Sequence, residues 1–483
     1  MSNAKKNYVY QIIYQVLVSI LPFITSPYIA RVLGADSIGI YSFTYSIVSY
    51  FGLFAMLGIF SYGNRAIAKA KDNKIHLNKT FTSLYILHLG LSLIAIIAYL
   101  GYLGFFVKEN KLIAFVQLLY LVSQLFDINW FFFGMEKFKI TVIRNCLIKI
   151  ITVVLIFALV NSKEDLWIYA LILSAGQLLS VLIIWPYLPK YARFCKVTVK
   201  EVFFHLKPMI ILFFAVIATS VFSYMDKIMI GSMSTYEQLG YYENSWKMIE
   251  FPVGFITALG TVMLPKIANL ITRNDDKAIS NYIYKSMRFS MISASAIAFG
   301  VAAISTEFSV IFWGEEFAAC GLIMKILSIS IILMSWNSVV RTQYLIPREF
   351  DRVYLLAVIC GAVVNLIMNA LLIPPFGASG AAVATVLSYC TICLVQNMYV
   401  RKKISLGKYF LESIPYLIIG FLMFVIIRVF KGYFSLGITI LFIEVFVGAF
   451  VFILFSFLYA YLRRDIFFIE LGKSIRNKLL HRS

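Results

Sequence analysis

The chain has 483 residues, of which 61% are hydrophobic and only 14% are charged. A soluble domain is about half apolar and about a quarter charged, so the composition excludes an ordinary soluble globular protein and predicts a bilayer protein. The net charge of +20 would suit nucleic-acid binding, but the basic residues sit in short loops between apolar runs, which argues against a nucleic-acid partner.

Apolar segments long enough to cross a bilayer recur along the whole chain. A membrane helix needs about 20 mostly apolar residues. The predicted helices are 8–33, 38–60, 80–106, 112–133, 140–160, 166–186, 208–231, 239–262, 282–304, 320–340, 353–373, 379–399, 410–429 and 437–461. No small-residue cleavage site follows the first apolar segment, so we expect no cleaved signal peptide. The sequence predicts an all-α integral membrane protein with about fourteen transmembrane helices.

The loops between these helices alternate sharply in charge. Of the 43 lysines and arginines, 31 fall in the termini and loops of one side, and four fall in the loops of the other side. Positive loops mark the cytoplasmic side, so both termini are predicted to be cytoplasmic. Two termini on one side require an even number of crossings, which supports the count of fourteen.

The outer loops are short and leave no room for an extracellular domain. The longest, around 305–320, is itself largely apolar. The tail 462–483 is predicted to be a basic amphipathic segment on the inner membrane surface, where anionic lipids attract it.

A weak internal repeat predicts how the helices group. A shift of 201 residues pairs Gly39 with Gly240 and Tyr41 with Tyr242, and both stretches join the first two helices of a six-helix block. Repeated blocks are typical of transporters. The predicted parts are a six-helix bundle over 1–207, a second over 208–409, two further transmembrane helices over 410–461 and a basic tail over 462–483.

Several charged residues fall at membrane depth, where each costs about 2.5–3.5 kcal/mol on insertion scales. Glu243, Lys247 and Glu250 are spaced to share one helix face. They are either a self-neutralising ladder that allows insertion or the wall of a hydrated cavity. Lys149 and Lys325 add further buried cations on other helices.

Uncharged polar stripes favour the cavity. Gln15 belongs to a stripe on the first helix, Tyr45 to one on the second and Gln124 to one on the fourth. Tyrosines with amides provide the flat apolar faces and hydrogen bonds that sugars use, although such stripes are more often contacts between helices. Pro22 and Pro27 should kink or break the first helix.

Features of enzymes and metal proteins are weak in this chain. Cys390 and Cys393 form a C-x-x-C on an apparent membrane helix without a nearby His or acidic partner, which favours core packing over metal or redox chemistry. No phosphate-binding loop for nucleotides is present in the sequence, so the chain is not expected to hydrolyse ATP. We expect neither a cofactor nor enzymatic activity.

Three segments, in order, resemble one family. They are "SPYIARVLGADSIGIYSF" (26–43) with "LGIFSYGNRAIAK" (57–69), "DINWFFFGMEKFKITVIRN" (127–145) and "DKIMIGSMSTYEQLGYYENSWKM" (226–248). These resemble the Wzx-type polysaccharide repeat-unit flippases, a group of the multidrug/oligosaccharidyl-lipid/polysaccharide exporter superfamily. The middle segment is similar to that group's D-x-x-W-x-x-x-G-x-E-x-F pattern, and the resemblance covers nearly the whole chain.

The resemblance implies two pseudo-symmetric six-helix bundles around a central cavity. It implies alternating-access transfer of lipid-linked oligosaccharide, carried on undecaprenyl pyrophosphate, from the inner to the outer leaflet of the bacterial cytoplasmic membrane. It implies membrane lipids as partners and allows a polysaccharide polymerase and chain-length machinery. Independently of the family, a buried ammonium without a full complement of carboxylates invites a phosphate.

The candidate site residues follow from the buried polar groups and this headgroup. The candidates for substrate binding are Lys247, Lys227, Lys149, Lys325, Arg31, Tyr45, Gln15, Gln124 and Asn244. The candidates for cation coupling are Asp226, Glu243 and Glu250. The related peptidoglycan-precursor flippases carry arginines in the membrane part of helix one, whereas Arg31 near the outer end is the arginine of that helix here. Lys247 is therefore the first candidate for the phosphate.

Two other functions stay open at this stage. A small-molecule cation exporter of related fold would use a cavity dominated by carboxylates. A membrane polysaccharide polymerase would need acidic residues in a sizeable outer loop, where Glu315 and Glu316 are the adjacent acidic pair.

Overall fold

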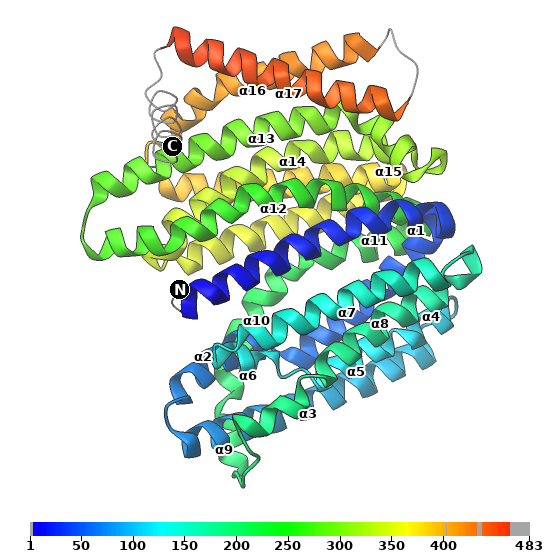
Figure 1. The fold of residues 1–483 in the computed structure, drawn as a ribbon, viewed down its shortest axis with the longest axis vertical. Helices are drawn as coiled ribbons and strands as arrows, with labels where there is room; N and C mark the ends of the chain where they lie inside the picture. Colours follow the sequence, from blue (N-terminus) through cyan, green and yellow to red (C-terminus); the bar gives the residue numbers. More distant parts are fainter. Residues whose placement is uncertain (1–2, 402, 432–436, 464–483) are drawn as a thin grey trace, which may run out of the picture. The chain divides into compact units, whose positions relative to one another are not determined.

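The computed structural model describes residues 3–401, 403–431 and 437–463, and all regular structure in these ranges is helical (Figure 1). In this described part, eleven helices are long and apolar enough to cross a membrane. The chain is therefore a multi-pass membrane protein. Nearly all of the predicted tail, 464–483, lies outside the described residues.

The eleven helices are consistent with fourteen crossings because two of them are double and one crossing is assembled from shorter pieces. Ile20–Ala70 spans 51 residues and contains Gly34 with a φ of 77°. Asp351–Val400 spans 50 residues and contains Gly377 with a φ of 55°. The predicted seventh crossing consists of three consecutive helical pieces that together reach from residue 206 to residue 233.

The chain divides into two compact units, residues 1–243 and 244–483. The helices of the first unit are α1 (Asn3–Met56), α2 (Ile59–Ala70), α3 (Lys74–Phe105), α4 (Lys111–Val116), α5 (Leu118–Leu125), α6 (Asn129–Gly134), α7 (Phe138–Leu159), α8 (Leu166–Leu182), α9 (Val199–Phe204), α10 (Leu206–Ser220) and α11 (Asp226–Met233), with the 3₁₀ turns η1 (Lys163–Asp165) and η2 (Trp185–Lys190) and the π-helical turn η3 (Val221–Met225). α1 packs against α3, α5 and α7, and α5 packs against α8. The boundary at 207/208 was predicted between two repeated six-helix bundles, and it stays a prediction.

The helices of the second unit begin with α12 (Tyr236–Thr272), whose first two turns belong to the first unit. The others are α13 (Asp276–Trp313), α14 (Cys320–Val340), α15 (Asp351–Val400), α16 (Leu406–Lys431) and α17 (Ile438–Leu462), with the 3₁₀ turns η4 (Glu315–Phe317) and η6 (Ile346–Arg348) and the π-helical turn η5 (Arg341–Leu345). α14 packs between α13 and α15, while α16 and α17 form a pair along α13 (Figure 1).

Several helix boundaries follow from local chemistry. The Asn73 side chain accepts hydrogen bonds from the backbone N–H groups of Ile75 and His76 and so caps α3. Thr198 and Glu201 form a capping box at the start of α9. Gly58, with a φ of 73°, precedes α2 and takes a left-handed conformation that glycine adopts without strain.

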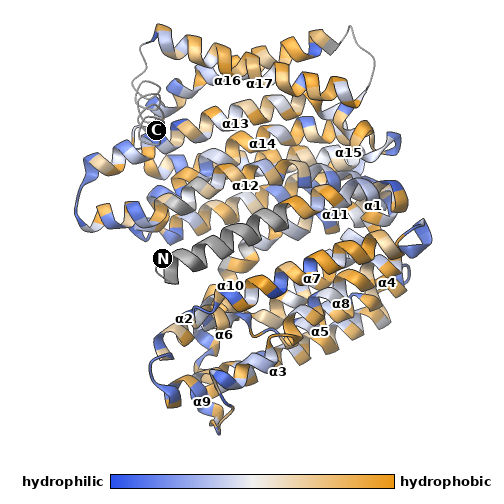
Figure 2. Cartoon of the chain, viewed as in Figure 1, coloured by the Kyte–Doolittle hydropathy of each residue, from blue (hydrophilic) through white to orange (hydrophobic). Residues whose placement is uncertain are grey.

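The hydropathy pattern fits a bilayer. Figure 2 shows apolar colour along the lengths of the long helices and hydrophilic colour concentrated in the connections between them. On α17, Phe446, Phe450 and Phe457 expose between 64% and 72% of their surface, which water would disfavour and lipid tails accommodate.

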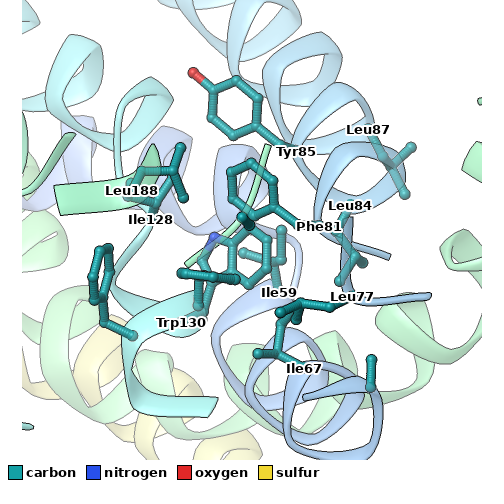
Figure 3. Close-up of a cluster of buried hydrophobic side chains, with 14 of the residues drawn as sticks. Ile59, Ile67, Leu77, Phe81, Leu84, Tyr85, Leu87, Ile128, Trp130 and Leu188 are labelled. Atoms are coloured by element: carbon teal, nitrogen blue, oxygen red, sulfur yellow. The ribbon is translucent and has the colours of Figure 1, made fainter. Parts of the chain in front are cut away.

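One buried cluster fixes α2, α3 and α6 against each other. Ile59, Ile67, Phe81 and Trp130 have no exposed surface, and the Phe81 and Trp130 rings stack with centroids 5.8 Å apart (Figure 3). Gly134 lies against Ile67 and the carbonyl of Asn64, where any larger residue would overlap them. This cluster therefore positions α2, the short helix between α1 and α3.

Two expectations from the sequence change here. The first helix continues through Pro22 and Pro27, so these prolines do not break it, and a kink at them stays a prediction. The break at Gly34 lies in the predicted connection between the first two helices, where glycine accepts the positive φ. The predicted ninth helix ended at residue 304, but α13 runs to Trp313 and encloses Glu307, which is 4% exposed. The outer connection is therefore shorter than the sequence indicated.

Candidate functional site in the first unit

Asp226 and Lys227 open α11 directly after the π-helical turn η3. π-helical turns are rare and frequently lie at functional sites, because the extra residue rotates the following side chains. As sequence neighbours the two side chains leave the helix in different directions. Each consequently meets a different partner on α12.

Lys227 pairs with Glu243. The Lys227 Nζ lies 2.7 Å from the Glu243 Oε2, and the two side chains are 17% and 13% exposed. Ser42 on α1 donates from its Oγ to the same carboxylate oxygen at 3.1 Å. A half-buried carboxylate thus joins α1, α11 and α12, and the opposite charges limit the cost of holding ions at membrane depth.

Asp226 has its own contact. Its side chain is 2% exposed, and the Tyr242 hydroxyl donates to the Asp226 Oδ2 at 2.7 Å. Tyr242 is also buried, at 2% exposed. Asp226 and Tyr242 directly precede Lys227 and Glu243 in the chain, so this hydrogen bond is a second link between α11 and α12.

A layer of tyrosines lies beside the ion pair. Tyr41 stacks on Tyr45 with ring centroids 5.7 Å apart, Tyr45 meets Tyr120 edge-on at 5.2 Å, and Tyr41 meets Tyr169 edge-on at 5.0 Å. The Glu243 carboxylate interacts electrostatically with Tyr41, Tyr45 and Tyr169. These four tyrosines are half-buried, so faces or hydroxyls remain accessible.

The structure brings some of the predicted site residues together. Lys227, Glu243, Asp226 and Tyr45 belong to one polar cluster on α1, α11 and α12. Gln124 is 7% exposed and packs with Tyr120 against α1 at Gly52.

The remaining predicted residues are placed as follows. Arg31 on α1 and Lys149 on α7 are exposed, and Lys325 on α14 is half-buried close to the charge of Arg428. Arg428 in turn lies 3.6 Å from the buried Glu307.

On α12, beyond the boundary of the first unit, Lys247 is half-buried and Glu250 is exposed. Asn244 is 1% exposed, and its Nδ2 has no hydrogen-bond partner among the described residues. The side chain of Gln15 lies outside what the structure describes. The phosphate role of Lys247 stays a prediction.

The D-x-x-W segment stabilises the fold instead of carrying chemistry. The Asp127 carboxylate accepts from the backbone N–H of Asn129 at 2.7 Å, and the Trp130 indole donates to the Asp127 carbonyl at 3.1 Å. Glu136 pairs with Lys71 at 2.9 Å, and this hydrogen bond holds the pKa of the Glu136 carboxyl below its ordinary value. The motif thus fixes α6 to the α2–α3 connection.

The sequence placed Glu243 on one helix face with Lys247. It gave no indication that Glu243 pairs with Lys227. Helical spacing suggested the neighbour four residues away, whereas packing supplied a partner sixteen residues earlier. The 201-residue shift held the signal for the other contact, because Ser42 and Glu243 are separated by that same 201.

Comparison with known proteins places this architecture. A family model described as "Polysaccharide biosynthesis protein" matches residues 4–271. A putative O-antigen transporter of Shigella dysenteriae is 25% identical over 387 residues, covering 78% of this chain and 94% of the relative. A probable low-salt glycan biosynthesis flippase of Haloferax volcanii is 28% identical over 185 residues, covering 38% of this chain and 39% of the relative.

Solved structures share the fold. The lipid II flippase MurJ in an inward closed conformation superposes with a TM-score of 0.76 at 16% identity, covering 93% of this chain and 99% of that one. An inward-facing multidrug resistance MATE transporter of the MOP superfamily gives a TM-score of 0.61 at 12% identity, covering 82% and 95% of the two chains. At these identities the likeness concerns the fold.

Proposed function

Because the chain belongs to the polysaccharide biosynthesis protein family, we propose that it is a flippase for undecaprenyl-pyrophosphate-linked oligosaccharide repeat units. It moves them from the inner to the outer leaflet of the bacterial cytoplasmic membrane by alternating access. The product supplies a cell-surface polysaccharide such as capsule, exopolysaccharide or O-antigen. The names of the relatives, an O-antigen transporter and a glycan biosynthesis flippase, support this assignment.

The observation that carries the proposal is a cation set beside tyrosines at membrane depth. Lys227 lies in an apolar helix, and its half-buried partner Glu243 adjoins the tyrosine layer. A lipid-linked sugar presents an anionic diphosphate next to a glycan. An ammonium binds the phosphate as a point charge, and the tyrosine faces and hydroxyls suit the sugar.

The proposed orientation follows from the loop charges. Both termini lie in the cytoplasm, and the lysine-poor connections face outward. The substrate headgroup enters from the cytoplasmic side while its polyprenyl chain stays in the bilayer. Membrane lipids are therefore standing partners, and a polymerase with its chain-length machinery would receive the product.

Reconstituted translocation tests the proposal. Purified protein in liposomes receives undecaprenyl pyrophosphate carrying a fluorescent oligosaccharide, and an impermeant quencher reports the leaflet of the sugar. We expect protein-dependent loss of leaflet asymmetry that the Lys227→Gln variant reduces. Transfer at the rate of protein-free liposomes would contradict the proposal.

A second candidate function rests on the carboxylates. Asp226 is 2% exposed and Glu243 is half-buried, a pattern that also suits export of a small organic cation. A cation exporter would extrude a fluorescent cationic dye from cells and leave the lipid-linked sugar where it is. The two assays together separate the candidates.

A further inference from the structure

Basic side chains lie over aromatic rings where η5, η6 and α15 meet in the second unit. The Arg348 guanidinium lies 4.5 Å from the centroid of the Tyr344 ring. The Arg341 guanidinium lies 5.7 Å from the centroid of the Tyr354 ring. The face of a ring attracts a cation through its quadrupole, but it supplies no negative charge, so the cation is held in place without being neutralised.

Lys403, which follows the end of α15, lies over two rings. Its Nζ is 4.8 Å from the centroid of the Phe350 ring and 5.4 Å from that of the Tyr399 ring. These rings meet edge-on at 5.5 Å, Phe350 lies 6.2 Å from Tyr344, and the Tyr354 N–H donates to the Phe350 carbonyl one turn earlier. The contacts are therefore continuous. We call these seven residues the cation–aromatic cluster: Arg341, Tyr344, Arg348, Phe350, Tyr354, Tyr399 and Lys403.

The backbone brings the parts of the cluster together. Glu349 takes a left-handed φ of 59° in the turn between η6 and α15, where the Phe350 N–H donates to the Leu345 carbonyl at 2.9 Å. Within α15, the Ser388 Oγ donates to the Gly361 carbonyl at 2.6 Å. This bond joins the two segments of α15, so the end of the second segment returns to the start of the first.

The carboxylates around the cluster neutralise little of its charge. Arg348 pairs with Asp276 at 3.0 Å, but the Asp276 side chain is 85% exposed, so water and salt weaken this pair. Within the part of the chain that the structure describes, neither Arg341 nor Lys403 forms an ion pair. The cluster therefore presents positive charge that an external anion can use.

The cluster lies at the basic end of the helices, which the loop charges predict to be cytoplasmic. The loops 341–352 and 400–408 hold seven basic residues and two acidic ones, Glu349 and Asp351. Both of these carboxylates are exposed. Anionic lipids give the cytoplasmic leaflet a negative surface potential, so cations at this depth meet lipid phosphates.

Apolar surface adjoins the cluster on α15. Tyr399 is 40% exposed, and Leu394 and Met398, which precede it on the same helix, are 58% and 65% exposed. An acyl chain can lie on this surface while its headgroup meets the cations. The neighbouring surface thus matches a lipid better than it matches a free anion.

We propose that the cation–aromatic cluster binds the phosphate of an anionic phospholipid in the cytoplasmic leaflet. Lys403 is the most exposed of the three cations and meets the phosphate, while Arg348 and Arg341 add positive potential. Because the rings hold the cations before the lipid arrives, little side-chain entropy is lost on binding. The site lies within the second unit and does not depend on the proposed function.

Lipid titration of the purified full chain tests the site. Delipidated protein in a neutral detergent receives phosphatidylglycerol or phosphatidylcholine with identical acyl chains, and native mass spectrometry counts the bound lipids. We expect the parent chain to bind phosphatidylglycerol about fivefold or more tightly than phosphatidylcholine, and Lys403→Gln to lose most of this preference. Equal affinity of the parent chain for the two lipids would overturn the proposal.

Lys139→Gln is the matched control, because it removes one exposed lysine from a loop of the basic side in the first unit. We expect it to bind phosphatidylglycerol as the parent chain does. Equal weakening in Lys139→Gln and Lys403→Gln would reveal general attraction to basic loops, which excludes a built site. Lys403→Arg should keep the parental affinity, since a guanidinium also lies well over aromatic rings.

A ring variant and a soluble anion complete the test. Tyr399→Leu keeps every charge but removes one ring face, and we expect it to weaken phosphatidylglycerol binding about twofold or more. Unchanged affinity would remove the rings from the site. Glycerol phosphate should not displace the lipid at equal concentration, and displacement would assign the cluster to free phosphate instead. Thermal unfolding without lipid confirms that each variant is folded.

Discussion

At the scale of single residues, Lys227 and Glu243 form a half-buried ion pair that joins α11 to α12. Lys227→Met should destabilise the protein by about 3 kcal/mol, because removing one partner leaves the other charge half-buried without it. Lys227→Met combined with Glu243→Gln should recover most of this loss. Thermal unfolding of the detergent-solubilised protein measures both, and two independent, additive losses would contradict the pairing.

Lys247 remains a separate candidate for the phosphate, on the next turns of α12. We expect Lys247→Ala to abolish surface polysaccharide while the protein still inserts, because a half-buried ammonium is well suited to an anionic headgroup. Polymer on the cell surface and protein in the membrane fraction are measured together. Export at the parental level would remove Lys247 from the site.

At the scale of elements, the start of α9 carries a pH-sensitive contact. Backbone and side-chain hydrogen bonds from Thr198, together with the ion pair to Lys79, lower the pKa of Glu201 to about 2. A carboxyl with a lowered folded-state pKa stabilises above its unfolded pKa, and this contribution disappears as the pH falls towards 2.

Glu201→Gln should therefore increase hydrogen exchange of α9 at pH 7, since the amide can still serve the cap but carries no charge for Lys79. The difference from the parent chain should shrink as the pH falls from about 4 towards 2. Lys200→Gln is the matched control, one residue away and exposed. A difference that stays constant with pH would show that charge is not the cause.

The helices themselves were predictable, because twenty apolar residues in sequence can hardly adopt another structure in a bilayer. The hydrogen-bond and ion-pair partners of the polar side chains were harder to predict from the sequence. The pattern placed Glu243 with Lys247, and only the approach of α1 and α11 to α12 shows Lys227 and Ser42 at its carboxylate. The turn at Gly34, by contrast, lies where the sequence predicted the connection between the first two helices, although Pro22 and Pro27 do not break the first of them.

At the scale of the whole molecule, the asymmetry of the loop charges predicts the orientation of every crossing. Of 43 basic residues, 31 lie on the side of the termini, so that side should stay in the cytoplasm. A green fluorescent protein fused after Ser483 should fluoresce, and alkaline phosphatase fused after Asn110 or Asn161 should be active, because phosphatase folds only outside. The reverse fusions, phosphatase after Ser483 and fluorescent protein after Asn110, are the controls and should be silent. If phosphatase were active at Ser483, the C-terminus would lie outside, and the orientation predicted from the loop charges would be wrong.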